Sequence, residues 1–238
     1  MGRTMHDIRY DSLHDEIVVP NPFAQAVITF RGSAQGEERP IRVIQGPKTQ
    51  MRHPDMLDID PAHNEIFVGG NDSIQVFSRE ANGDAAPIRV IRGPKTGLRG
   101  ANAMAVDPVH NVVVVPSSYG EERTPSLLIF NRTDQGDVAP RRVILGARTS
   151  RQLTIYSPRG WILANTATGS PRERNQMSTI SVWSIHDNGN VPPRWQLGGP
   201  KSTLLRARGI GVNPKTKEVI VADMQLNAVL TYYFPEIF

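Results

Sequence analysis

The sequence predicts an all-β fold, a β-propeller made of four-stranded antiparallel blades. Three observations indicate it. A segment of roughly 50 residues recurs along the chain, each unit consists of short strand-like runs, and no helical periodicity of useful length is present. A small sheet of this kind has two apolar faces, and radial stacking buries both of them. We expect five blades in the 238 residues, the last without its outer strand.

The clearest repeat is Pro-Ile-Arg-Val-Ile-x-Gly-Pro-Lys-Thr, at residues 40–49 and 87–96, with degenerate copies at 140–149 and 193–202. In every copy the glycine before the Pro-Lys position follows another glycine by 10 residues and an aromatic residue by 16. We expect the aromatic residue to pack between neighbouring sheets rather than to bind a ligand. The aromatic residues are Phe30, Phe77, Phe130 and Trp183.

Each unit is expected to contain an inner strand A, then B and C, then an outer strand D that carries the repeat motif. Asp-Pro turns at 60–61 and 107–108, and Asn-Pro at 213–214, close the A–B hairpin. Runs of β-branched and apolar residues mark the other two strands. Strand B is expected at 16–19, 65–68, 112–115, 161–164 and 218–221, and strand C at 26–30, 73–77, 127–130, 179–183 and 228–232.

These units predict one domain over 1–238, with blades at about 5–54, 55–101, 102–151, 152–207 and 208–238. The segment Gly2-Arg3-Thr4-Met5 is similar to the end of the repeat motif, yet no outer strand precedes it. We therefore expect the chain to be the C-terminal part of a longer product that includes a further blade. On that hypothesis the absence of an apolar signal-peptide stretch near Met1 says nothing about location.

The motif, together with Val221-Ala-Asp-Met-Gln-Leu-Asn-Ala-Val229, resembles the NHL-like branch of β-propellers, including bacterial repeat proteins. The resemblance covers nearly the whole chain. It implies six blades and a periplasmic or secreted location. It indicates the fold strongly and the activity weakly, because that branch includes lyases, lactonase-like enzymes and binding modules.

The composition excludes several classes of protein. With no cysteine, the chain has no disulfide, no Cys-ligated metal and no thiol nucleophile. No apolar run approaches the roughly 20 residues of a membrane helix. Lys+Arg 27 against Asp+Glu 23 leaves a net charge of +4 without a basic cluster, so we expect no nucleic-acid partner. No Gly-x-Ser-x-Gly elbow, Walker loop or dinucleotide fingerprint is present.

The connections from each outer strand to the next inner strand carry basic residues. In this topology these crossovers and the B–C loops emerge on one face, and the A–B and C–D turns on the other. Basic side chains around one opening focus a positive potential and can hold a carboxylate or phosphate. The alternative is that they extend into water or pair with acidic neighbours. The predicted ligand-binding channel mouth consists of Arg52, His53, Arg99, Arg151, Arg206 and Arg208.

Two neighbouring blades have longer B–C loops, at 116–125 and 165–177. Insertions on one face of a repeat protein often mark its binding face, and Tyr and Arg are common interface anchors. Tolerated variation in loop length is the alternative. The predicted interaction residues of these loops are Tyr119, Glu121, Glu122, Arg123, Arg172, Glu173 and Arg174.

A metal-dependent enzyme would need several His, Asp, Glu or Asn side chains converging at the channel. The weak candidates for Ca²⁺ or another divalent ion are Asp55, Asn102, Asn165 and Asp223, with Asp58 nearby in sequence. The histidines His14, His63 and His110 share one position of the repeat, in the A–B turn. We interpret them as turn residues that pack or hydrogen-bond, not as metal ligands, and we assign no catalytic residue.

Together these features favour a non-catalytic binding module whose channel mouth engages a protein or a small anionic ligand, without a cofactor. Two alternatives stay open. One is a divalent-metal-dependent hydrolase or lyase of the NHL or gluconolactonase-like type, and the other is a purely structural repeat module. Membrane insertion is not expected, and the sequence does not indicate the oligomeric state.

Overall fold

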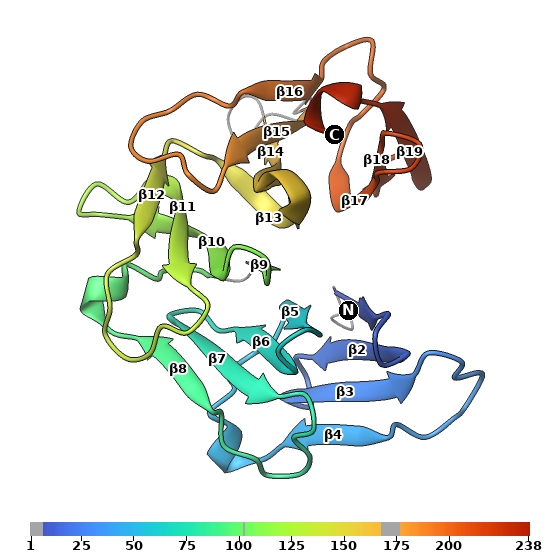
Figure 1. The fold of residues 1–238 in the computed structure, drawn as a ribbon, viewed down its shortest axis with the longest axis vertical. Coiled ribbons are helices and arrows are strands. Elements are labelled where there is room, and N and C mark those ends of the chain that lie inside the picture. Colours follow the sequence, from blue (N-terminus) through green and yellow to red (C-terminus); the bar gives the residue numbers. More distant parts are fainter. Residues whose placement is uncertain (1–6, 102, 168–176) are drawn as a thin grey trace.

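The computed structural model describes residues 7–101, 103–167 and 177–238, and it shows a five-bladed β-propeller (Figure 1). The first two sheets contain β1 (Arg9–Asp11), β2 (Glu16–Asn21), β3 (Ala26–Arg31) and β4 (Arg42–Gln45), then β5 (Leu57–Asp60), β6 (Glu65–Gly69), β7 (Ser73–Ser78) and β8 (Arg89–Arg92). The next two contain β9 (Ala105–Asp107), β10 (Val112–Tyr119), β11 (Thr124–Asn131) and β12 (Arg142–Leu145), then β13 (Thr149–Tyr156), β14 (Trp161–Ala167), β15 (Ser178–Ser184) and β16 (Trp195–Gly198). The fifth contains β17 (Ala207–Asn213), β18 (Glu218–Asp223) and β19 (Ala228–Tyr233).

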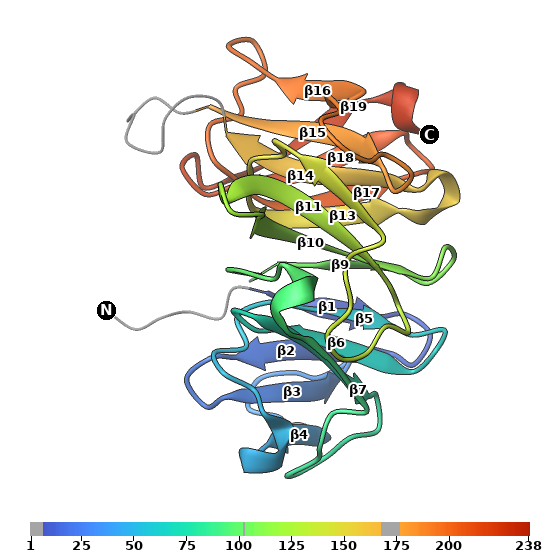
Figure 2. The same cartoon turned by 90° about the vertical axis from the view of Figure 1, so that its left-hand side faces the viewer.

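Within each sheet the antiparallel strands lie side by side in sequence order, which confirms the predicted A-B-C-D arrangement. The inner strands β1, β5, β9, β13 and β17 follow one another around the axis, and consecutive ones are in contact. Figure 2 shows the five sheets stacked side by side. The fifth sheet has three strands, as predicted, and the sixth blade implied by the resemblance is not found among the described residues.

Hydrophobic cores lie between neighbouring blades. Phe77 of the second blade packs with Val18 and Val27 of the first, and Phe130 of the third packs with Phe67 of the second. Trp183 of the fourth blade lies in a core with residues of the third. In the second, third and fourth blades the repeated aromatic residue therefore fills the interface with the preceding blade, which confirms its predicted packing role there.

The glycine that lies 10 residues before the Gly-Pro-Lys glycine joins its blade to the outer strand of the preceding blade. Gly83, in the loop after β7, forms a parallel bridge with Ile44 of β4. The Gly83 N–H donates to the Val43 carbonyl at 2.7 Å, and the Gln45 N–H donates to the Gly83 carbonyl at 2.9 Å. Gly83 has φ 66°, a left-handed conformation that glycine adopts without steric cost. Equivalent bridges join Ile91 to Gly136 and Ile144 to Gly189.

The Gly-Pro-Lys-Thr motif forms a short 3₁₀ turn after the outer strand, Pro47–Thr49 in the first copy. The buried Thr49 hydroxyl donates to the Gly46 carbonyl at 2.7 Å and accepts from the Met51 N–H at 3.3 Å. The Met51 side chain is then buried in the core. Thr96 and Leu98 repeat this arrangement in the next copy. In these two copies the motif therefore anchors the crossover, and the following Arg52 and Arg99 are exposed.

Two glutamates at the start of strand B each pair with an arginine of their own blade and with an arginine of the next blade, and so join the two blades. Glu16 accepts from Arg42 of its own blade and, at 2.9 Å, from Arg79 of the second blade. The equivalent Glu65 contacts Arg89 at 2.8 Å and Arg132 of the third blade at 2.6 Å. These glutamate side chains are 9% exposed, so the pairs are largely shielded from water. A shielded pair of this kind is costly to break from one side.

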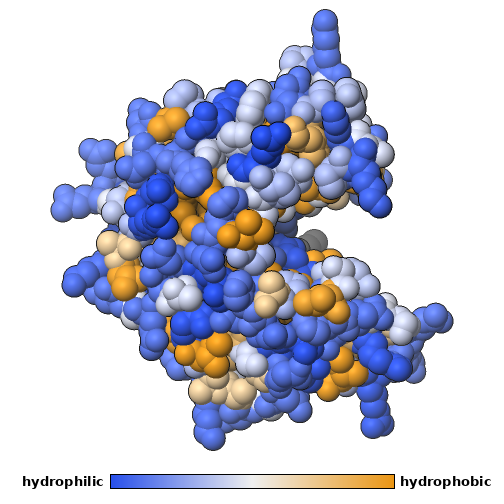
Figure 3. Space-filling view, in the orientation of Figure 1, coloured by the Kyte–Doolittle hydropathy of each residue, from blue (hydrophilic) through white to orange (hydrophobic). Residues whose placement is uncertain are grey.

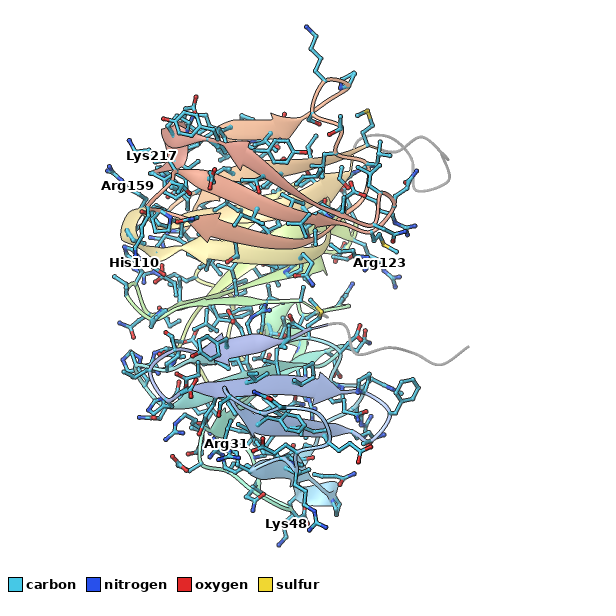
Figure 4. The ribbon with its side chains drawn as sticks, turned by 90° about the vertical axis from the view of Figure 1, so that its right-hand side faces the viewer. Arg31, Lys48, His110, Arg123, Arg159 and Lys217 are labelled. Carbon is cyan, nitrogen blue, oxygen red and sulfur yellow. The ribbon has the colours of Figure 1, made fainter. Side chains whose placement is uncertain are left out.

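The A–B turns lie on the opposite face from the B–C turns. In Figure 4, His110 and Arg159 lie at one end of the strands, whereas Arg123 lies at the other. The repeated histidines pair with the aspartate three residues before them: His14 with Asp11 at 2.8 Å, His63 with Asp60 at 2.7 Å and His110 with Asp107 at 2.7 Å. The same aspartates accept backbone N–H groups of the turn. Their predicted role as turn residues is confirmed.

Candidate functional site

The predicted basic crossovers fall into two groups. Arg52, His53, Arg99 and Arg206 are exposed in connections between blades. Arg208 is half-buried and lies in β17, and position 151 lies in β13, so these two belong to inner strands rather than to crossover loops. The six residues therefore do not form a single ring of loop arginines, because each inner strand begins at a different point after its crossover.

A cavity of about 820 Å³ lies on the face of the crossovers, at the first blade. Arg52 and His53 line it from the crossover, together with Arg92 from the end of β8. The other lining residues are Ala24, Gln25, Gln45, Gly46, Pro47, Gln50 and Met51, and none of them carries a carboxylate. The cavity is therefore a basic site with amide groups in its wall.

Hydrogen bonds hold the wall of this cavity in place. Arg92 donates to the Ser73 hydroxyl at 3.2 Å. The buried Gln75 donates from the same amide to that hydroxyl at 3.1 Å and to the Gln50 carbonyl at 3.3 Å. The Gln45 amide donates to the Ala24 carbonyl at 2.8 Å. Arg92 was not among the predicted site residues, because it occupies the variable position x of the repeat motif.

A second cavity, of about 700 Å³, lies between the first and fifth blades. Asp7, Arg9 and Val19 line one side of it, and Arg208, Ile220 and Val229 line the other. Figure 3 shows that the molecule is hollowed where these two blades face each other, so the ring is open there.

Arg9 is the charged centre of this second cavity. It donates to Asp58 of the second blade at 2.8 Å and also contacts Asp7. Burial raises the pKa of the Asp7 carboxyl above its ordinary value, although Arg9 and the Leu57 N–H oppose that shift. Both carboxylates already neutralise Arg9, so this cavity offers less positive charge than the first.

The B–C loop of the third blade is shorter than predicted, because β10 and β11 extend to Tyr119 and from Thr124. Glu121, Glu122 and Arg123 are exposed at its tip. Tyr119 is half-buried and packs on the core between the second and third blades. The Tyr119 side chain therefore contributes to the packing between these two blades.

Arg99 connects the two predicted features of this face. Its N–H donates to the Ser117 hydroxyl at 2.8 Å, and its guanidinium reaches the Gly120 carbonyl at 3.5 Å. The crossover and the B–C loop thus meet here. The interaction residues predicted in the next blade, Arg172, Glu173 and Arg174, lie outside the described residues.

Two of the weak metal candidates, Asp223 and Asn165, have backbone partners in the structure. Asp223 accepts four backbone N–H groups, and Asn165 donates to the Ala207 carbonyl at 2.6 Å between blades. Asp55 is half-buried, and Asn102 lies outside the described residues. No group of three or more His, Asp or Glu side chains able to hold a metal ion occurs in the part of the chain that the structure describes. No helix within the same residues is long and apolar enough to cross a membrane.

Comparison with solved structures places the fold in the class of β-propellers. Hydrazine synthase from Kuenenia stuttgartiensis matches with a TM-score of 0.66 at 13% identity, over 94% of this chain and 63% of that one. A putative 6-phosphogluconolactonase from Bacteroides uniformis matches with a TM-score of 0.59 at 15% identity, over 94% of this chain and 65% of that one.

A β-propeller domain from Myceliophteria thermophila matches with a TM-score of 0.59 at 12% identity, over 92% of this chain and 62% of that one. The chain thus spans just under two thirds of the length of these structures. No protein-family model matches it, and neither does any curated protein. At these identities the likeness shows the fold alone.

Proposed function

We propose that the protein is a non-catalytic binding module that takes a small anionic ligand in the cavity lined by Arg52, His53 and Arg92. The observation that carries the proposal is the composition of that cavity, which has two arginines and a histidine in its lining and no carboxylate. Guanidinium groups bind carboxylates and phosphates through paired hydrogen bonds. The volume of about 820 Å³ suits a small molecule.

The second cavity supports anion binding less well, because Asp7 and Asp58 already pair with Arg9. The alternative of a metal-dependent hydrolase or lyase would require converging oxygen or nitrogen ligands, and no group of three or more His, Asp or Glu side chains that could hold a metal ion lies in the residues that the structure describes. Binding without chemistry is therefore the function that these residues support best.

The proposal is tested by calorimetric titration of the whole chain with phosphate and with a phosphorylated sugar acid. We expect saturable binding that weakens with ionic strength, because the attraction is electrostatic. Arg52→Ala should lower the affinity by about tenfold, the range of one charge-assisted hydrogen bond. The matched control is Arg159→Ala, an exposed arginine on the opposite face (Figure 4).

Equal affinities for the wild type and Arg52→Ala would contradict the proposal, and so would an equal loss in Arg159→Ala. Heat released by Ca²⁺ or Mn²⁺ in the absence of an anion would instead favour the metal-dependent alternative.

A further inference from the structure

The crossover of the first cavity has a counterpart one blade later. Residues 46–53 and 93–100 both begin with Gly-Pro-Lys-Thr, and Arg52 in the first segment has the same place as Arg99 in the second. Both arginines are exposed, but Arg52 lines the cavity of about 820 Å³ and Arg99 does not. The surroundings of Arg99 therefore indicate which groups can occupy the space beside Arg52.

The B–C loop of the third blade occupies the space beside Arg99. The Ser117 hydroxyl accepts the Arg99 N–H at 2.8 Å and donates to the Gly97 carbonyl at 2.8 Å. The Arg99 guanidinium donates to the Gly120 carbonyl at 3.5 Å. The Tyr119 ring lies against Gly97, where a Cβ atom would be 2.6 Å from it. The loop thus supplies an acceptor to both the N–H and the side chain of Arg99.

The corresponding loop of the second blade is too short to do this. Gly70 has the place of Ser117, because each lies ten residues after the aspartate of its A–B turn, and it brings no hydroxyl. The Gly70 N–H donates to the Ser73 carbonyl at 2.8 Å, so the chain reverses before it reaches a counterpart of Tyr119. The space that Ser117 and Tyr119 fill in the third blade is therefore left to the cavity beside Arg52.

Arg52 has two donor groups, its main-chain N–H and its guanidinium, that lack an acceptor in the part of the chain that the structure describes. The lining of the cavity has no carboxylate that would neutralise the side chain. The neighbouring Gln50 carbonyl, in contrast, accepts from the Gln75 amide at 3.3 Å. The unused groups of Arg52 are therefore donors, and an oxyanion can accept from both through charge-assisted hydrogen bonds.

We propose that the N–H and the guanidinium of Arg52 together hold one oxyanion group of the ligand, in the place that Ser117 and Gly120 take beside Arg99. This role of Arg52 rests on the anion-binding function proposed above. A terminal phosphate or carboxylate fits it, because its oxygens accept from both donors at once. Gly70 keeps this place open, since a hydroxyl at that position would itself accept from the Arg52 N–H.

The first test is calorimetric titration of the whole chain with inorganic phosphate in two variants, Gly70→Ser and Gly70→Ala. A Cβ atom at Gly70 would lie 2.8 Å from the Ser73 hydroxyl, which must move in both variants alike. Only the serine also brings an acceptor for the Arg52 N–H, as Ser117 does for Arg99. We expect Gly70→Ser to bind phosphate about tenfold more weakly than its matched control Gly70→Ala, the effect of losing one charge-assisted hydrogen bond.

The second test needs no substitution, because it follows the backbone amide resonances of the wild type by NMR during the same titration. The Arg52 amide proton should move downfield and saturate at the affinity that calorimetry gives, since it gains a charged acceptor. The Arg99 amide is the internal control. It is already bonded to Ser117, so its resonance should stay in place.

An Arg52 amide resonance that does not move while phosphate binds would overturn the proposal, and so would equal affinities of Gly70→Ser and Gly70→Ala. If the wild type binds phosphate and Arg52→Ala weakens that binding, either result leaves the anion site intact and removes only the role of the N–H. A wild type that does not bind phosphate would instead refute the anion-binding function, and the role of the N–H with it.

Discussion

The carboxylate of Asp223 holds two backbone segments together. It accepts N–H groups from Leu205 and Arg206 at 2.7 and 2.8 Å, and from Gln225 and Leu226 at 2.9 and 3.0 Å. Burial raises the pKa of Asp223, but the four donors lower it by more, so the pKa lies below its ordinary value of 3.8. The sequence suggested a metal ligand, whereas these contacts bind the crossover before β17 to the turn after β18.

Asp223→Asn should destabilise the fold by about 1–3 kcal/mol, because the amide nitrogen would face two N–H donors. Since the folded pKa is lowered, the contribution of Asp223 is present above pH of about 4 and is lost as the pH falls through the folded pKa. Urea unfolding of both proteins at pH 7 and at several lower values checks this. A difference between them that does not shrink with falling pH would contradict this explanation.

At the scale of the elements, neighbouring blades are joined by apolar cores, by bridges at Gly83, Gly136 and Gly189, and by shielded ion pairs. Arg132 shows the last of these. It contacts Glu65 at 2.6 Å and Asp60 at 3.5 Å, both in the preceding blade. Among the described residues, the ion pairs between the second and third blades are both formed by Arg132, a residue outside the repeat motif.

Arg132→Met should lower the free energy of unfolding by about 3–5 kcal/mol, because Glu65 and Asp60 would stay buried with less compensation. The matched control is Arg31→Met. Arg31 pairs with Glu38 but is 61% exposed, and exposed pairs contribute about 0–1 kcal/mol. Chemical denaturation of the two variants measures the difference, and equal losses would show that shielding from water does not matter here.

At the scale of the whole molecule, the ring is open between the first and fifth blades (Figure 3). Phe30 has the same place in the repeat as Phe77 and Phe130, which are 0% exposed, yet Phe30 is only half-buried. Its face of the first blade is the one that a preceding blade covers elsewhere in the structure. The first blade therefore has an incomplete apolar interface.

Phe130→Ala should cost about 3–5 kcal/mol in unfolding free energy, as for a large side chain deleted from a core. Phe30→Ala should cost clearly less, because less apolar surface leaves water on folding. Thermal and chemical unfolding of both variants checks this order. Equal losses of unfolding free energy in the two variants would contradict this explanation, because they would mean that Phe30 is as well covered in solution as Phe130.

The repeat determined much of the structure, for local reasons. Glycines, prolines and β-branched runs recur at constant spacing, so the blade, its strand order and the role of Phe77 could be predicted from neighbours in sequence. The turn histidines could be interpreted for the same reason, since Asp107 and His110 are only three residues apart.

The candidate sites depended on the tertiary structure. Arg92 lines a cavity with Arg52 because two blades meet there, and Arg9 pairs with Asp58 across 49 positions of sequence. Arg208 proved to lie in a strand, because where a crossover ends depends on packing against the next blade. The sequence by itself thus determined the repeating unit, since that unit depends on local hydrogen bonding and side-chain pattern. Only the tertiary structure decided which charges meet, because that depends on how neighbouring blades pack together.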